Sequence, residues 1–176
     1  MADFNQALEH LLELEGYPGY VDIHGDSGGE TVAGISRNNW SHWAGWQLVD
    51  TFKLSVNFKQ RLNDSAQLRR MVAAFYQANF WTVWMQTIDD QQLAQWLFQM
   101  GVVSGLSQSA KLLQRAVGVE ADGRFGLKSR AALLAADPVA VLAECRDLAQ
   151  HFYRDLADRN PQDRQFLAGW LNRANA

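Results

Sequence analysis

Residues 15–36 read EGYPGYVDIHGDSGGETVAGIS, and this stretch decides the fold of the chain. It starts with a carboxylate, Glu15, and passes through glycine, proline and tyrosine residues into two short segments. The sequence GDSGG at 25–29 is typical of a chain reversal between them. The pattern predicts a small β-hairpin with strands at 20–26 and 30–36. Gly34, inside the second strand, indicates a close approach of the backbone to another group.

A helix is predicted directly before this stretch, from Asp3 to Glu15. Its apolar residues recur at helical spacing: Phe4, Leu8, Leu11 and Leu12. A rotation of about 100° per residue places Glu15 in the middle of this apolar stripe, whereas Glu9 and Glu13 fall away from it. Gly16 and Pro18 then end the helix. Of the three glutamates, only Glu15 is therefore expected to face the interior.

A carboxyl group in that position is a candidate general acid. Apolar neighbours disfavour the charged form of a carboxyl, so Glu15 is expected to keep a proton that it can give to a leaving group. The alternative is that Glu15 belongs to a fraying last turn and is merely solvated.

The hairpin supplies the other candidate site residues. Side chains alternate along an extended segment, so Asp22, His24 and Asp26 share one face. That face could line a cleft, with Asp26 as a second carboxylate and Thr31 orienting a water molecule. Candidate substrate contacts are Tyr20, Asp22, His24 and Ser36. The alternatives are a solvated hairpin tip or a metal held by the Asp-x-His-x-Asp pattern, but no further His or Cys has supporting spacing. We expect no metal and no cofactor.

The rest of the chain predicts a mainly α protein. Helices are expected at Ser65–Phe80, at Asp89–Val103 as a buried central helix, and from Asp137 to Asp155. A further helix, capped at Asn38 or Asn39, would carry Trp40 and Trp43. These two are interpreted as core residues unless they line a groove, where they would be walls of a sugar subsite. Cys145 is interpreted as a buried, inert thiol.

Composition excludes several classes of protein. The net charge of −3 gives no electrostatic argument for binding nucleic acid, and one cysteine in 176 residues excludes an internal disulfide framework. No apolar run reaches membrane-spanning length, and the first residues lack the pattern of a secretory signal. The chain is therefore expected to be made in the cytoplasm and to carry no integral membrane segment.

At residues 15–36 the sequence resembles glycoside hydrolase family 108. The resemblance rests on Glu15, on the turn Gly16–Tyr20, and on the run Asp26–Ser36, which matches an Asp-x-Gly-Gly-x-Thr segment with a Gly-Ile-Thr/Ser end. This chain has two extra residues between Glu15 and the Gly-Tyr pair. Further on, residues 110–126 are similar to the peptidoglycan-binding module of the same family, and residues 166–173 to its closing Phe-Leu-x-Gly-Trp-x-x-Arg segment.

The resemblance implies a lysozyme-like fold in which the hairpin forms one wall of the cleft. Residues 1–95 would be catalytic and residues 96–176 peptidoglycan-binding, packed into one compact unit. It implies an N-acetylmuramidase that cleaves the β-1,4 bond between N-acetylmuramic acid and N-acetylglucosamine in peptidoglycan glycan strands, with Glu15 as the acid. Alternatives are a lytic transglycosylase and a non-catalytic wall-binding or secretion-assisting protein.

The resemblance also suggests a phage- or prophage-derived lysis protein, of the endolysin or secretion-activator type. It would act on the cell wall, in the periplasm, after release by another route. An export partner such as a holin is then expected.

Overall fold

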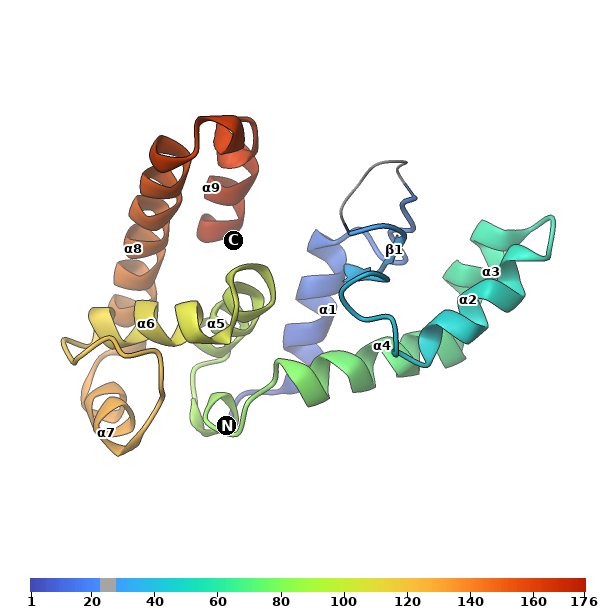
Figure 1. Ribbon diagram of the computed structural model, residues 1–176. Coiled ribbons are helices and arrows are strands. Elements are labelled where there is room, and N and C mark those ends of the chain that lie inside the picture. Colours follow the sequence, from blue (N-terminus) through green and yellow to red (C-terminus); the bar gives the residue numbers. More distant parts are fainter. Residues whose placement is uncertain (23–27) are drawn as a thin grey trace. The chain divides into compact units, whose positions relative to one another are not determined.

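The computed structural model describes residues 1–22 and 28–176, which are mainly helical with one two-stranded antiparallel sheet (Figure 1). The predicted mainly α class with a small hairpin is confirmed. The chain divides into two compact units: Phe4–Trp81, here the N-terminal unit, and Thr82–Ala176 with Met1–Asp3, here the C-terminal unit. The predicted boundary at 95/96 lies inside a helix of the second unit. The division of function between residues 1–95 and 96–176 stays a prediction.

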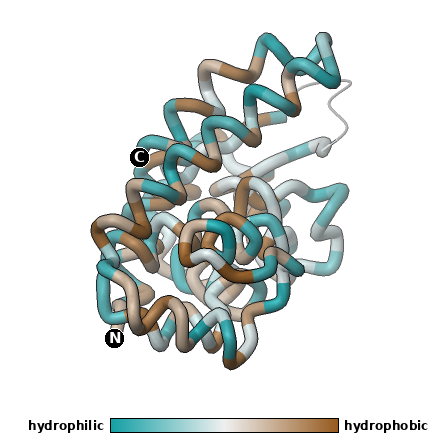
Figure 2. The backbone as a smooth tube through the Cα atoms, turned by 90° about the vertical axis from the view of Figure 1, so that its left-hand side faces the viewer, coloured by the Kyte–Doolittle hydropathy of each residue, from teal (hydrophilic) through white to brown (hydrophobic). Residues whose placement is uncertain are grey.

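The N-terminal unit is built around a long first and a long last helix. Its elements are α1 (Phe4–Leu14), β1 (Thr31–Val32), β2 (Ile35–Ser36), α2 (Gly45–Lys53), α3 (Phe58–Asp64) and α4 (Ala66–Asn79). The apolar stripe of α1 is buried, and α1 packs against α4. As predicted, α4 begins after Ser65, whose hydroxyl accepts a 3.0 Å hydrogen bond from the Leu68 N–H. Figure 2 shows hydrophobic and hydrophilic residues alternating along the helical backbone of the chain.

The hairpin differs from the predicted one in where the chain reverses. Thr31 pairs with Ser36 and Val32 with Ile35, so the reversal is at Ala33–Gly34 and the predicted single strand 30–36 is wrong. Both turn residues have positive φ, 50° and 77°, as two-residue hairpin turns of type I′ require. The earlier segment joins the sheet through one bridge, Val21 to Thr31. The predicted turn at 25–29 lies mostly outside the described residues.

The segment after the hairpin is also different from the prediction. Helix α2 begins at Gly45, so the expected helix capped at Asn38 or Asn39 is wrong in its start. Trp40 and Trp43 lie in the non-helical segment of turns before α2. The indole N–H of Trp46, inside α2, donates a 2.9 Å hydrogen bond to the Trp40 carbonyl and fixes these turns. Only Trp46 of the three is fully buried.

The C-terminal unit packs its helices around the predicted buried central helix. Its elements are η1 (Met85–Thr87), α5 (Gln91–Ser104), α6 (Leu106–Ala116), α7 (Leu127–Ala135), α8 (Pro138–Arg159), η2 (Pro161–Phe166) and α9 (Leu167–Asn175). Helix α5 contacts both α6 and α8. Trp96 of α5 donates a 2.9 Å hydrogen bond to the Ala174 carbonyl, which holds α9 in place. Nowhere in the described ranges does a helix combine the length and apolar character that crossing a bilayer requires.

A buried glutamine organises the loop between α6 and α7. Gln114 donates to the Asp122 carboxylate at 2.8 Å and accepts from the Gly123 N–H at 2.8 Å. The backbone N–H of Arg124, and then Gln114, lower the pKa of Asp122. The Gln and Asp-Gly residues that suggested a peptidoglycan-binding module therefore act, in this fold, as the clamp of a loop.

Cys145 lies fully buried on α8. Burial, and secondarily the charge of Glu144, raise the pKa of its thiol to about 12. A thiol with that pKa carries almost no thiolate near neutral pH, so the interpretation as an inert core residue is confirmed.

Candidate active site

Glu15 follows the last residue of α1 and continues its direction. Its backbone N–H donates to the Leu11 carbonyl at 3.0 Å, which keeps the helical rotation for one more residue. The side chain of Glu15 is half-buried, whereas Glu9 and Glu13 on the same helix are exposed. The prediction that only Glu15 turns toward the interior is confirmed.

The hairpin turn comes close to the Glu15 carboxyl group. A Cβ atom on Gly34 would lie 3.3 Å from Glu15 Oε2 and 2.7 Å from the Tyr76 hydroxyl. That hydroxyl donates a 2.7 Å hydrogen bond to the carbonyl of Ala33, so α4 holds the turn in place. Gly34 itself is exposed. The end of α1, the turn and α4 therefore meet at a point that solvent can reach, and the close approach predicted at Gly34 is confirmed.

Two of the other predicted site residues, Thr31 and Ser36, lie in the hairpin. Thr31 begins β1, and its hydroxyl lies 3.5 Å from the Gly29 carbonyl. The Ser36 hydroxyl donates a 2.6 Å hydrogen bond to the Gly28 carbonyl, so it ties the two ends of the hairpin together. Asp22 is exposed. His24 and Asp26 lie outside the described residues.

Tyr20 belongs to a second cluster, centred on a carboxylate that the sequence did not single out. Glu30 is only 8 % exposed and forms ion pairs with Arg37, at 2.9 Å to its Nε, and with Lys53. Arg37 also contacts Asp50 at 2.6 Å. The Tyr20 ring lies 5.5 Å from the Lys53 ammonium and packs edge-on against Phe58.

The pKa shifts of Lys53 and Asp50 favour the charged forms of both groups. Burial lowers the pKa of Lys53, but hydrogen bonds and charge from Glu30 and Tyr20 outweigh burial, so the net pKa is raised. The hydrogen bond from Arg37 lowers the pKa of Asp50. Burial, and then Glu30, raise the pKa of the Tyr20 phenol. Glu30 therefore acts as the counter-ion that holds α2 against the hairpin.

Replacement of Glu30 by glutamine is expected to lower the free energy of unfolding by about 2 kcal/mol, because it leaves two cations without their shared anion. The value stays below that of a fully buried pair, since Arg37 and Lys53 keep about a third of their side-chain surface exposed. Urea unfolding followed by circular dichroism measures it. Asp50→Asn is the control: Asp50 pairs with the same arginine but is exposed, so its loss is expected to cost less than about 1 kcal/mol. Equal losses in the two variants would contradict a special role for Glu30.

The sequence did not predict the roles of two residues, Tyr76 and Glu30. Tyr76 lies within the predicted helix Ser65–Phe80, and only the need of a buried tyrosine for a hydrogen-bond partner indicates a further role. Glu30 was assigned to a strand. The backbone carbonyl of Glu30 accepts a 2.7 Å hydrogen bond from the Arg37 N–H, so these two residues face each other across the hairpin. A prediction with the correct turn would have placed Glu30 opposite Arg37.

Within residues 1–22 and 28–176, no three His, Cys, Asp or Glu side chains group closely enough to hold a metal ion.

Comparison with known proteins identifies the family. The family model described as Glycosyl hydrolase 108 matches residues 8–105, and the one described as Predicted Peptidoglycan domain matches residues 108–175. No curated protein sequence matches the chain. Among solved structures, the Brucella abortus protein SagA is similar with a TM-score of 0.67 and 25% sequence identity, over 98% of this chain and 89% of that one. These findings agree with the predicted mainly α, lysozyme-like fold class. Because the first model covers more than half of the chain, the protein belongs to the glycosyl hydrolase 108 family, the peptidoglycan-degrading glycosidases that its sequence resembles.

Proposed function

We propose that the protein is an N-acetylmuramidase that hydrolyses the β-1,4 bond between N-acetylmuramic acid and N-acetylglucosamine. Glu15 is the general acid. It protonates the leaving glycosidic oxygen while positive charge develops on the sugar ring, as in other glycosidases that use paired carboxylates.

One observation carries this proposal: Glu15 is half-buried, and its carboxyl group lies beside the exposed Gly34 turn. A general acid needs a fixed carboxyl group that a substrate can still approach. The apolar stripe of α1 on one side and the turn held by Tyr76 on the other supply the first condition. The absence of a side chain at Gly34 supports the second.

The other candidate residues of the sequence take the remaining roles in the proposal. Asp26 stabilises the developing charge or activates a water molecule, and Thr31 helps to place that water. Substrate contacts are assigned to Tyr20, Asp22, His24 and Ser36, of which His24 lies outside the described residues.

Product analysis tests the proposed reaction. Purified protein is incubated with isolated sacculi, and the released fragments are analysed by mass spectrometry. Hydrolysis leaves reducing N-acetylmuramic acid ends. A lytic transglycosylase, in which the 6-hydroxyl of the sugar attacks, would leave 1,6-anhydro ends and contradict the proposal. Binding to sacculi without any release of fragments would favour a non-catalytic wall-binding protein instead.

A further inference from the structure

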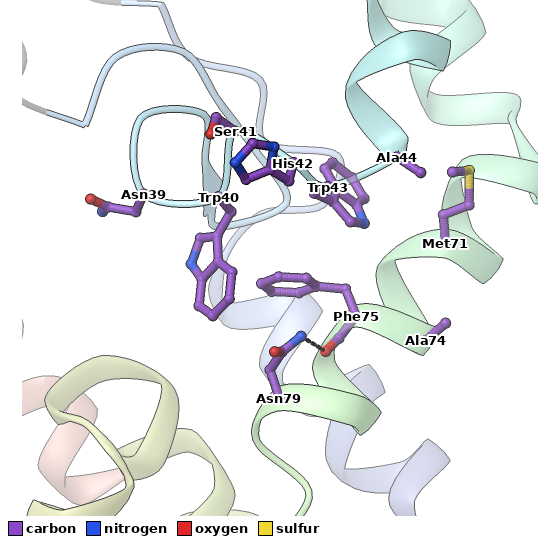
Figure 3. Close-up of a pocket in the computed structure, with 10 residues that line it drawn as sticks. All are labelled: Asn39, Trp40, Ser41, His42, Trp43, Ala44, Met71, Ala74, Phe75 and Asn79. Atoms are coloured by element: carbon purple, nitrogen blue, oxygen red, sulfur yellow. Dashed lines mark hydrogen bonds between the residues drawn. The ribbon is translucent and has the colours of Figure 1, made fainter.

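A pocket of about 500 Å³ lies in the N-terminal unit between the turns that precede α2 and the outer face of α4 (Figure 3). Most of its wall is aromatic or aliphatic, and three rings dominate it: Trp40, Trp43 and Phe75. The volume is within the range of about 300–1,000 Å³ that small-ligand pockets occupy. Trp40 and Trp43 were expected to be core residues unless they line a groove. They do line this pocket.

The rings support one another by their edges. Trp40 meets Phe75 at a centroid distance of 4.9 Å and an angle of 88°, and Trp43 meets it at 5.9 Å and 61°. Such edge-to-face contacts fix the orientation of an indole without covering both of its faces. Trp40 is 37% exposed, whereas Trp46, six residues later, is 4% exposed. Trp40 is therefore a fixed aromatic surface that is open to solvent.

Polar groups surround this aromatic floor. Ser41, His42 and Asn79 line the pocket and are exposed. The Asn79 amide donates a 2.8 Å hydrogen bond to the Phe75 carbonyl, shown dashed in Figure 3, which fixes the amide group at the rim. A pyranose ring has an apolar C–H face and a polar edge of hydroxyl and acetamido groups. An aromatic floor with a rim of hydroxyl, imidazole and amide groups is complementary to both.

The pocket is connected to the acid through one helix. Phe75, which forms its floor, and Tyr76, which holds the turn beside Glu15, are consecutive residues of α4, and their rings pack at 5.3 Å. Consecutive helical residues point about 100° apart, so the pocket and the turn beside Glu15 are supported by adjacent sides of α4. A polymer of linked sugars is the ligand that can occupy both regions at once.

We propose that this pocket is a saccharide-binding subsite in which the Trp40 indole stacks on an N-acetylated sugar of the glycan strand. The proposal rests on the proposed glycosidase function for its ligand class. Neither Glu15 nor Gly34 lines the pocket. The pocket therefore contributes to binding of the strand rather than to the chemical step, and its loss raises KM more than it lowers kcat.

Binding is tested in the full-length chain with the Glu15→Gln substitution, so that the probe is not consumed. The probe is a soluble N-acetylglucosamine oligosaccharide, titrated by calorimetry. Trp40→Phe keeps a flat ring and is expected to bind within about threefold of its parent. Trp40→Leu keeps the apolar packing against Phe75 but has no flat face, and is expected to bind about tenfold more weakly. Trp84→Leu is the control, because Trp84 stacks on Phe125 in the other unit and is expected to leave affinity unchanged.

A second measurement needs no substitution at the tryptophan. The indole N–H signal of Trp40 in the ¹H–¹⁵N NMR spectrum is expected to shift on titration, while that of Trp84 does not. Equal affinity of the leucine variant and its parent, an unmoved Trp40 signal, or no binding of the probe would each overturn the proposal. Failure of Glu15 as the acid would appear only as retained turnover by Glu15→Gln, so the two failures are distinguishable.

Discussion

Replacement of Glu15 by glutamine is expected to lower the rate of fragment release from sacculi by at least about 10²-fold, the loss typical of removing a general acid. Glutamine has the shape of glutamate and fills the same space beside the Gly34 turn. It cannot, however, protonate a leaving oxygen. The rate constants of wild type and variant are measured by the release of reducing ends, and folding is checked by thermal unfolding.

The chain offers a matched control for this experiment. Glu13 lies two residues earlier in α1 and is exposed, so Glu13→Gln makes the same chemical change away from the turn. Its activity is expected to stay within about twofold of wild type, since a solvated surface carboxylate takes no part in the chemistry. Equal turnover by wild type and Glu15→Gln would remove Glu15 from the role of acid. Equal losses in both variants would point to general surface charge instead.

The placement of Glu15 was predictable because it depends on local regularity. The spacing of Leu8, Leu11 and Leu12 fixes which side of α1 is buried, and Glu15 follows from the same rotation. The start of α4 was predictable from its cap: the side-chain oxygen of Ser65 accepts from the N–H three residues later. The helix predicted from Asp89 begins at Gln91, where Asp90 caps it in the same way.

The register of the hairpin was not predictable from local preference. Residues 25–29 are rich in turn-forming residues, whereas Ala33 adopts a positive φ that alanine disfavours. Contacts from elsewhere hold this turn: the Ala33 N–H donates to the Pro18 carbonyl at 2.7 Å, and its carbonyl accepts from Tyr76. A partner 43 residues away is invisible to local sequence reasoning. The error in the turn then concealed the Glu30–Arg37 pair.

The aromatic pocket could not be predicted from residue spacing. Trp40, Trp43 and Trp46 are spaced three apart, a pattern that helices use for core residues. The chain instead forms turns before α2, which separate the buried Trp46 from the exposed Trp40. Spacing alone gives the same pattern for a core and for a subsite wall. Only the backbone path decides between them.

Replacement of Gly34 by alanine is expected to lower activity about 10²-fold, because a misplacement of about 1 Å at a catalytic group has effects of that size. The new Cβ would lie 2.7 Å from the Tyr76 hydroxyl and 3.3 Å from Glu15 Oε2, so the turn, the tyrosine or the acid must move. The positive φ of 77° adds a cost of about 1 kcal/mol to folding.

Gly118→Ala is the control that separates the two effects of Gly34→Ala, the contact of the new Cβ and the cost of the positive φ. Gly118 has a similar φ of 73°, but a Cβ there meets nothing within 4 Å, and the residue belongs to the other unit. In urea unfolding, both variants are expected to lose the stability that the positive φ costs, and Gly34→Ala is expected to lose more because its Cβ also clashes with Tyr76. Only Gly34→Ala is expected to lose activity. If Gly34→Ala kept full activity, the turn could not be what positions the acid, and the half-buried carboxyl of Glu15 would have to owe its orientation to α1 alone. If both variants lost activity equally, backbone strain rather than contact with Glu15 would be the cause.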